Sequence, residues 1–162
     1  MKFLYAPWRM AYIKKFSEKC SECFLCKASK EDRDAENLVV YRGEKCFAIL
    51  NRYPYNNGHL MIAPYKHASR LADLDEKELT ELMKLIKLSI DVLEKEYRPD
   101  GFNVGLNLGR AAGAGLEDHL HFHIVPRWIG DTNFMPVISE TKVIPESFYD
   151  SWKRIKKRFQ SL

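Results

Sequence analysis

Short, mainly apolar runs between positions 38 and 64, separated by polar turn residues, predict three short strands. Their apolar runs cover residues 38–41, 46–50 and 59–63, and turn-forming Gly and Asn residues separate them. Because the connecting segments are short, these strands are expected to form an antiparallel meander.

The next segment has the spacing of one long amphipathic helix. Asp75 is placed as an N-cap, with Glu78 three residues later as its capping-box partner. Apolar residues then recur on one helical face, at Leu79, Leu82, Met83, Ile86, Ile90, Leu93 and Tyr97. Residues 98–101 contain Pro and Gly and end the helix. We expect this helix to cover one face of the sheet.

Two further strands are predicted at 102–108 and 120–128, joined by a Gly- and Ala-rich connection, and a last helix at 145–159. The order of strands, helix, strands, helix favours the α+β class over a βαβ arrangement.

Length and composition fit one folded domain over 1–162. Within it, 1–33 is an irregular segment that carries cysteines, 38–128 is the core and 145–162 is a basic C-terminal helix. With 46% hydrophobic and 30% charged residues, the chain is not of the disordered class. No apolar stretch approaches the roughly 18–20 residues of a membrane span and no signal peptide is apparent, so we expect a cytoplasmic protein without a membrane partner.

The formal net charge of +4 is mild, and its excess is concentrated near the C-terminus. The cations there are Lys153, Arg154, Lys156, Lys157 and Arg158. Such a run is typical of a solvated helix end, where cations also suit the helix dipole. We therefore do not expect nucleic acid as a partner on the basis of charge.

Three of the four cysteines lie within residues 20–26. In a reducing compartment these are thiols or metal ligands rather than disulfides. The two-residue gap between Cys23 and Cys26 lets both thiolates reach one metal ion. A redox pair and buried inert thiols are the alternatives.

Three of the five histidines, His119, His121 and His123, alternate with apolar residues. On a strand they share one face. Such an arrangement either holds zinc as a hydrolase site or presents a nucleophile. The nearby residues Gly113, Ala114 and Gly115 lack bulky side chains and could cradle a phosphate, which favours attack of an imidazole on phosphorus.

The run 119–125 resembles the signature of the histidine triad (HIT) superfamily, in which three histidines alternate with apolar residues. The resemblance extends to segments 51–54 and 58–67. Segments 7–10, 113–118 and 126–137 resemble the diadenosine tetraphosphate phosphorylase branch of that superfamily.

This resemblance implies a HIT-like fold, with a five-stranded antiparallel sheet covered by the long helix, and a homodimer. It implies a nucleotide substrate whose nucleotidyl group is transferred through His121, while His123 contacts the scissile phosphate or the leaving group. Asn51 would hold the ribose hydroxyls, and His59 would lie near the active site. Asn107, with Gly113, Ala114 and Gly115, would line the phosphates.

The branch also implies inorganic phosphate as the second nucleophile, so that diadenosine tetraphosphate would give ATP and ADP. Two alternatives stay open. Water could be the acceptor, which makes the protein a hydrolase of dinucleoside polyphosphates or nucleoside phosphoramidates. The chain could instead be a zinc-stabilised module that binds nucleotides or nucleic acid.

Several zinc-carrying triad proteins combine a Cys-x-x-Cys pair with a histidine like His67 and with the first triad histidine, and this chain resembles them. The resemblance implies a structural zinc site of Cys23, Cys26, His67 and His119. Cys20 is a possible substitute ligand, and Cys46 is expected in the core.

Overall fold

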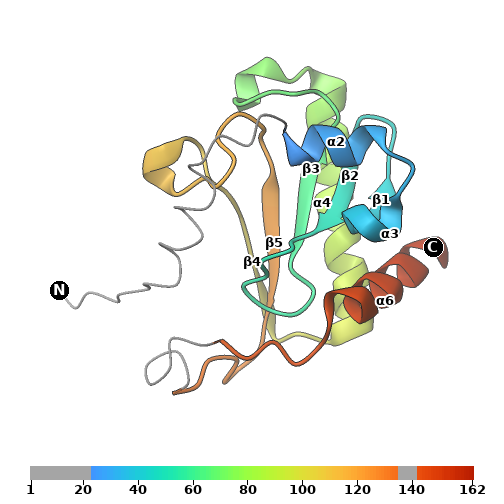
Figure 1. Cartoon of the computed structure of the whole chain (residues 1–162), viewed down its shortest axis with the longest axis vertical. Helices are drawn as coiled ribbons and strands as arrows, with labels where there is room; N and C mark the ends of the chain where they lie inside the picture. Colours follow the sequence, from blue (N-terminus) through green and yellow to red (C-terminus); the bar gives the residue numbers. More distant parts are fainter. Residues whose placement is uncertain (1–22, 135–141) are drawn as a thin grey trace.

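The computed structural model describes residues 23–134 and 142–162 (Figure 1). The predictions made for segment 7–10 and for Cys20 lie outside these residues.

The centre of the structure is a five-stranded antiparallel sheet with the order β1-β2-β3-β5-β4. Its strands are β1 (Val39–Arg42), β2 (Cys46–Leu50), β3 (Leu60–Pro64), β4 (Gly101–Leu106) and β5 (Phe122–Arg127). Every residue of β2 and β3 is buried, so these two strands form the middle of the core. The α+β class and the predicted sheet are confirmed.

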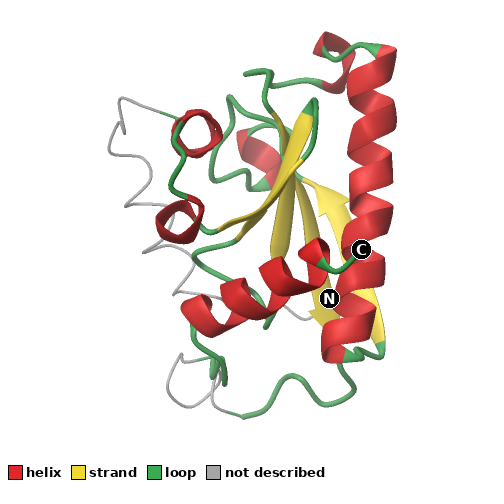
Figure 2. Ribbon diagram, turned by 90° about the vertical axis from the view of Figure 1, so that its right-hand side faces the viewer, coloured by secondary structure: helices red, strands yellow, loops and turns green. Residues whose placement is uncertain are grey.

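Helix α4 (Glu76–Tyr97) lies along one face of the sheet (Figure 2). Asp75 and Glu78 form the predicted capping box, with hydrogen bonds of 2.8 Å in both directions. The buried stripe differs from the predicted one: Met83 is 59% exposed, whereas Leu85 is buried. The buried face of the helix also includes Ser89, which is fully buried.

The C-terminal helix α6 (Phe148–Gln160) packs against β1 and α4. Ile155 is fully buried, and the Trp152 indole N–H donates to the carbonyl of Val39 at 2.9 Å. Cations of the helix also pair within the chain, because Arg154 and Arg158 contact Glu96 at 2.8 and 3.1 Å.

Two short helices precede the sheet: α2 (Phe24–Lys30) and α3 (Asp34–Asn37). The expectation of an irregular segment over 1–33 was therefore wrong for the residues of α2. Cys23 caps α2 by accepting the amide of Cys26 at 3.5 Å, and Leu25 and Ala28 are buried in the core. Burial against distant strands stabilises a helix too short to be recognised from its own periodicity.

The carboxylate of Glu81 ties α4 to the turn between β1 and β2. It accepts the amides of Lys45 and Cys46 at 2.7 and 3.0 Å. A Cβ added at Gly43 would collide with Oε1 of Glu81, so a side chain at this position would compete with the carboxylate for the same space. Cys46 is fully buried, as expected.

The strands β4 and β5 are shorter than predicted, ending at Leu106 and beginning at Phe122. The chain before β5 bonds elsewhere, since Leu120 donates its amide to the carbonyl of Ala68 at 2.7 Å. The connection between the two strands contains the one-turn helix η2 (Arg110–Ala112), and η1 (Leu71–Asp73) precedes α4.

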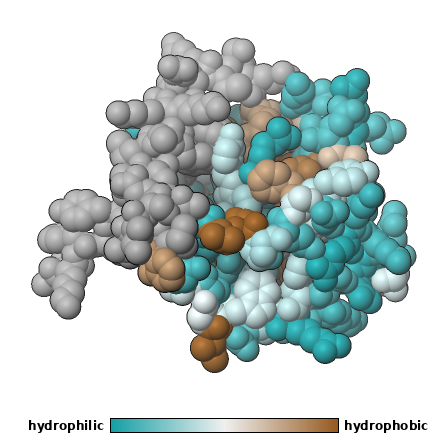
Figure 3. All heavy atoms as spheres, turned by 60° about the horizontal axis from the view of Figure 1, so that its bottom comes forward, coloured by the Kyte–Doolittle hydropathy of each residue, from teal (hydrophilic) through white to brown (hydrophobic). Residues whose placement is uncertain are grey.

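The surface seen in Figure 3 is mainly hydrophilic, with a few separate hydrophobic groups. Over the described ranges, no helix combines the length and apolarity that crossing a bilayer requires.

Candidate active site and metal cluster

Four metal-ligating side chains meet beside the end of β3. The ligand atoms of Cys23, Cys26, His67 and His119 all lie within 4.8 Å of one another. Nδ1 of His119 is 3.2 Å from the Cys23 sulfur, and Nδ1 of His67 is 3.2 Å from the Cys26 sulfur. The two thiols and two imidazoles come from segments far apart in sequence, and together they could hold a metal ion.

The backbone determines which nitrogen His119 offers to this cluster. Its Nε2–H donates to the carbonyl of Pro64 at 2.9 Å, so the neutral ring carries its proton on Nε2. Nδ1 is then left with the lone pair that faces the thiols. A metal-binding histidine usually has its second nitrogen held in this way.

His121 has the opposite arrangement. Its Nδ1–H donates to the carbonyl oxygen of His119 at 2.8 Å, which leaves Nε2 unprotonated in the neutral ring. The side chain is buried, and this burial lowers the pKa of His121, with the hydrogen bond to His119 opposing the shift. The residue therefore presents a neutral imidazole with a nucleophilic Nε2.

His59 and His123 form a chain of hydrogen bonds that begins at the backbone. The amide of Tyr55 donates to Nδ1 of His59 at 3.1 Å, and Nε2 of His59 is 3.0 Å from Nδ1 of His123. Because Nδ1 of His59 accepts, its proton is on Nε2 and is donated to His123. Neutral His123 then carries its own proton on Nε2, where it can be donated to an oxygen of a substrate.

The environment of His59 keeps it neutral. The side chain is fully buried, and this burial, followed by the charges of His123 and His121, lowers the pKa of His59 well below its usual value. His59 therefore does not face the solvent.

Asn51 lies against the same histidine. Its Oδ1 accepts the amide of Tyr53 at 2.9 Å, and its Nδ2 is 3.5 Å from Nε2 of His59. Since both of these nitrogens carry protons, the second distance is a contact rather than a hydrogen bond. Asn51 is buried, so a ligand would reach it only at the edge of its amide.

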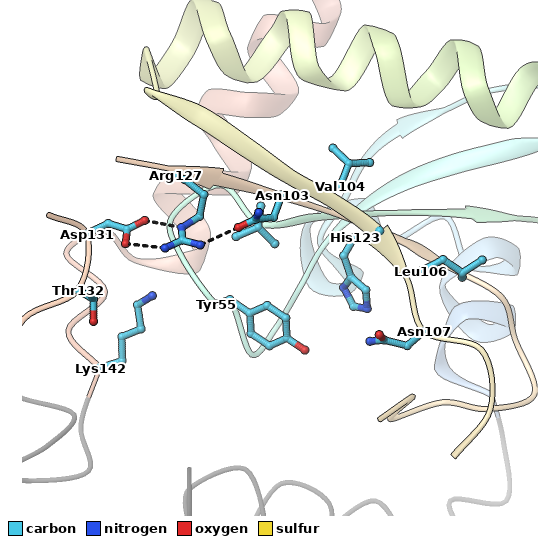
Figure 4. A pocket seen from close by; sticks show the side chains of 12 residues that line it. Tyr55, Asn103, Val104, Leu106, Asn107, His123, Arg127, Asp131, Thr132 and Lys142 are labelled. Carbon is cyan, nitrogen blue, oxygen red and sulfur yellow. Dashed lines mark hydrogen bonds and ion pairs between the residues drawn. The ribbon is translucent and has the colours of Figure 1, made fainter. Parts of the chain in front are cut away.

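A cavity of about 490 Å³ opens next to His123, along strands β4 and β5 (Figure 4). Asn107 and His123 lie on its wall, whereas His59 and His121 are buried and are not among its lining residues. The triad is thus divided: His119 faces the thiols, His121 is held below the surface, and His123 reaches the cavity.

The loop of Gly113, Ala114 and Gly115 is half-buried and follows the one-turn helix η2. Gly113 has a φ of +84°, which favours glycine, and its amide donates to the carbonyl of Arg110 at 2.9 Å. That amide is used inside the loop.

The sequence interpretation assigned only Asn107 and His123 of this cavity wall, and the polar or aromatic wall residues that it missed include Tyr55, Arg127 and Asp131. Tyr55 stacks on His123 with ring centroids 5.9 Å apart, and Arg127 is paired with Asp131. The sequence offered only weak signals for these residues. Tyr55 is an aromatic residue in the turn before His59, and Arg127 and Asp131 are opposite charges four positions apart.

Comparisons with known proteins agree with this geometry. A family model described as HIT domain matches residues 32–128. The chain is 44% identical over 154 residues to AP-4-A phosphorylase of Mycobacterium tuberculosis, covering 91% of this chain and 79% of that protein.

Among solved structures, a hypothetical histidine triad nucleotide-binding protein from Sulfolobus tokodaii superposes with a TM-score of 0.70 at 33% identity, covering 86% of this chain and 93% of that one. A Zn-bound histidine triad family protein from Mycobacterium smegmatis has a TM-score of 0.69 at 21% identity, over 87% and 95% of the two chains, and shares the fold. By its family match, its sequence relatives and its fold, the chain belongs to the HIT family.

Proposed function

We propose that the protein transfers a nucleotidyl group from a dinucleoside polyphosphate to inorganic phosphate, through a covalent intermediate on His121. Diadenosine tetraphosphate would give ATP and ADP. The observation that carries this proposal is the 2.8 Å hydrogen bond from Nδ1 of His121 to the His119 carbonyl, which leaves Nε2 as a nucleophile. The substrate class is supported by the 44% identity to a protein named AP-4-A phosphorylase.

In the first step, Nε2 of His121 attacks the phosphorus atom next to one nucleoside. A nitrogen–phosphorus bond forms, the bond to the bridging oxygen breaks, and ATP leaves with the bonding electrons. The Nε2–H of His123 donates to an oxygen of the reacting phosphate or of the leaving group, where negative charge develops. The positive charge of the phosphorylated ring is stabilised through Nδ1–H by the His119 carbonyl.

In the second step, an oxygen of inorganic phosphate attacks the same phosphorus atom. The nitrogen–phosphorus bond breaks, its electron pair returns to Nε2 of His121, and ADP is released. Splitting one displacement into two by a covalent intermediate is the usual advantage of a nucleophilic side chain.

Substrate contacts are part of the same proposal. Asn107 lies on the cavity wall and would contact the phosphates, together with the loop of Gly113, Ala114 and Gly115. Asn51 would contact the ribose hydroxyls from its position beside His59. In this scheme His59 touches no substrate and acts by orienting His123.

Product analysis of diadenosine tetraphosphate, with and without inorganic phosphate, tests this function. We expect ATP and ADP only when phosphate is present, with labelled phosphate appearing in ADP. Release of AMP irrespective of phosphate would instead indicate a hydrolase. With substrate labelled at the phosphate next to adenosine and no acceptor, the wild-type protein should retain label and His121→Gly should not. Label on a folded His121→Gly variant would exclude His121 as the nucleophile.

We also propose that the cluster of Cys23, Cys26, His67 and His119 binds zinc. Two thiolates and two imidazoles form the donor set that zinc prefers, and four protein ligands complete a tetrahedral site. Bound there, the metal would supply a structural cross-link between α2, the segment after β3 and the start of the triad. Because the thiols must stay reduced, this site fits the cytoplasm. Metal analysis of the purified protein, compared with a Cys23→Ser variant, tests it.

We further propose that residues 1–162 form one domain and that two such chains pair as a homodimer. The position of β4 at the edge of the sheet supports this, because Val104 in the strand and Leu108 just after it are 43% and 48% exposed and a Cβ added at Gly105 would meet no atom within 4 Å. An exposed strand edge with apolar side chains is a site at which a second chain can bind. Sedimentation equilibrium should give twice the mass of one chain, and a monomer across micromolar concentrations would contradict it.

A further inference from the structure

Strand β4 has a glycine directly opposite the proposed proton donor. Gly105 pairs with His123 in the register of β4 and β5. Residues that face each other in an antiparallel pair project from the same face of the sheet, with their Cβ atoms roughly 4.5–5.5 Å apart. A side chain at position 105 would therefore stand next to the imidazole of His123.

The strand itself does not require glycine at this position. The φ of Gly105 is not positive, so its backbone conformation is open to other residues. The pairing of β4 with β5 runs residue by residue from Gly101 to Leu106, so the strand has no bulge there. A Cβ added at Gly105 would meet no atom of the described residues within 4 Å, so packing does not exclude a side chain either.

Glycine at such a position is unfavourable, because it weakens a strand and gives it no side chain to pack. Where a bulge is absent, a glycine within a strand often marks the close approach of a ligand or of another backbone. The missing Cβ of Gly105 would project from the face that carries His123, and both residues line the cavity of about 490 Å³. That volume lies within the roughly 300–1,000 Å³ of small-molecule sites, which favours a ligand.

Gly105 is a gap in the wall of this cavity. Asn103 and Asn107, two positions before and after it, both line the cavity with their side chains. Figure 4 shows Asn107 and His123 toward one end of the cavity, and Arg127 at the other. The gap therefore opens beside His123, where the cavity meets the reacting centre.

The part of the substrate that would lie over Gly105 follows from the other contacts. Asn51, the proposed ribose contact of the transferred nucleotide, is not among the lining residues of the cavity. The cavity is thus left for the other part of the dinucleotide. His123 does line it, and the Nε2–H of His123 is the proposed donor to the leaving group. A polyphosphate that departs from His123 would pass over the residue opposite.

We propose that Gly105 determines which leaving groups the protein accepts. Its missing side chain leaves room beside His123 for a polyphosphate chain that carries a second nucleoside. A side chain there would narrow this space and favour substrates with a small leaving group, such as the amine of a nucleoside phosphoramidate. Gly105 takes part in no bond-breaking step. This inference rests on the proposed function and deepens it.

The test compares Gly105→Ala and Gly105→Val with Gly101→Val. Gly101 is the matched control, because it lies on the same strand and an added Cβ there also meets no described atom within 4 Å, yet it does not line the cavity. With phosphate present, we expect Gly105→Val to lower kcat/KM for diadenosine tetraphosphate at least about tenfold, the lower end of what one extra or missing methylene group costs in a substrate pocket. Gly105→Ala should lower it less, and Gly101→Val should match the wild type.

The inhibition constant of AMP separates the two parts of the substrate. AMP carries the transferred nucleotide without the leaving polyphosphate, so Gly105→Val should leave this constant unchanged. Equal losses for AMP and the dinucleotide would assign Gly105 to the reacting centre as a whole and overturn the proposal. An unchanged kcat/KM for the dinucleotide would also overturn it.

Two further measurements on the same variants exclude a structural cause. The Tm of Gly105→Val should not fall below that of the wild type, because valine suits a strand better than glycine. Sedimentation equilibrium should give the same mass for all variants. A loss of activity that accompanies a change of mass would assign the glycine to contact with a second chain instead of the leaving group.

Calorimetry separates the role of Gly105 from the proposed function. The probe is an analogue of diadenosine tetraphosphate whose bridging oxygens are replaced by methylene groups, so that it binds without reacting. Gly105→Val should weaken binding of this analogue and leave binding of AMP unchanged. That result in a protein that phosphorolyses no dinucleotide would leave the role of Gly105 standing and remove the function. Equal binding of the analogue by all variants of an active enzyme would remove the role of Gly105 alone.

Discussion

The carbonyl oxygen of His119 accepts a hydrogen bond from Nδ1 of His121 at 2.8 Å, while the ring of His119 faces the thiols of the metal cluster. One residue thus joins the cluster to the proposed nucleophile through its own backbone. Any movement of His119 changes the direction in which Nε2 of His121 points.

Removing the zinc ion proposed for this cluster should therefore lower turnover, although the proposed mechanism gives no cluster residue a contact with the substrate. We expect chelation, or Cys26→Ser, to reduce kcat about 10–100-fold, as is typical when the support of a reactive group is lost, and to lower Tm. Metal content, kcat and Tm are measured on the same samples. Chelator added to Cys26→Ser is the control and should have no further effect. Full kcat in metal-free protein would mean that the two sites are independent.

Replacing His59 should act through His123. His123→Ala is expected to lower kcat about 10²–10⁴-fold, the usual range for loss of a proton donor. His59→Phe should lower it less, because His123 is still present but no longer held by the 3.0 Å hydrogen bond.

A double-mutant cycle shows whether His59 acts through His123 or whether the two residues contribute to turnover independently. Adding His59→Phe to His123→Ala should cost almost nothing more, because the first residue acts only through the second. Additive losses would show that His59 has another role.

The Cys46 thiol should resist modification while the other thiols react. Burial, followed by the charges of Glu81 and Glu78, raises the pKa of Cys46 to about 12, so almost none of it is thiolate near pH 8. In a Cys20→Ser background, a thiol reagent should modify Cys23 and Cys26 after chelation and leave Cys46 unmodified. Mass spectrometry of the digested protein gives the sites, and unfolding in denaturant should then expose Cys46.

The C-terminal helix should contribute strongly to stability. Ile155 is a fully buried residue of α6, which packs against β1 and α4, so Ile155→Ala should reduce the free energy of unfolding by about 2–5 kcal/mol. Lys157→Ala, on the exposed side of the same helix, should change it by less than about 0.5 kcal/mol. Urea unfolding measures both. Equal effects of the two substitutions would mean that α6 is not packed as described.

Elements that depend on local pattern were predicted well. The capping box of Asp75 and Glu78 and the apolar spacing after it gave the helix α4 within a residue of its bounds. The prediction that Met83 lies on the buried face was wrong. Periodicity places apolar residues on one side of the helix, but it does not specify which of them the sheet covers.

Features that depend on distant contacts were not predicted from residues alone. The meeting of Cys23 and Cys26 with His67 and His119 joins separate segments, and only the resemblance to other triad proteins indicated it. The hydrogen bond from Tyr55 to His59 is donated by a backbone amide, so no residue type in the sequence predicts it.

The contact between Gly43 and Glu81 has a consequence for how this sequence can diverge. The carboxylate occupies the place that a Cβ at position 43 would take, and it accepts the amides of Lys45 in the turn and of Cys46 at the start of β2. A side chain at position 43 would displace the carboxylate, and loss of the carboxylate would leave those amides without their acceptor. Across related chains, the two positions should therefore vary together or not at all, although neither is near the histidines.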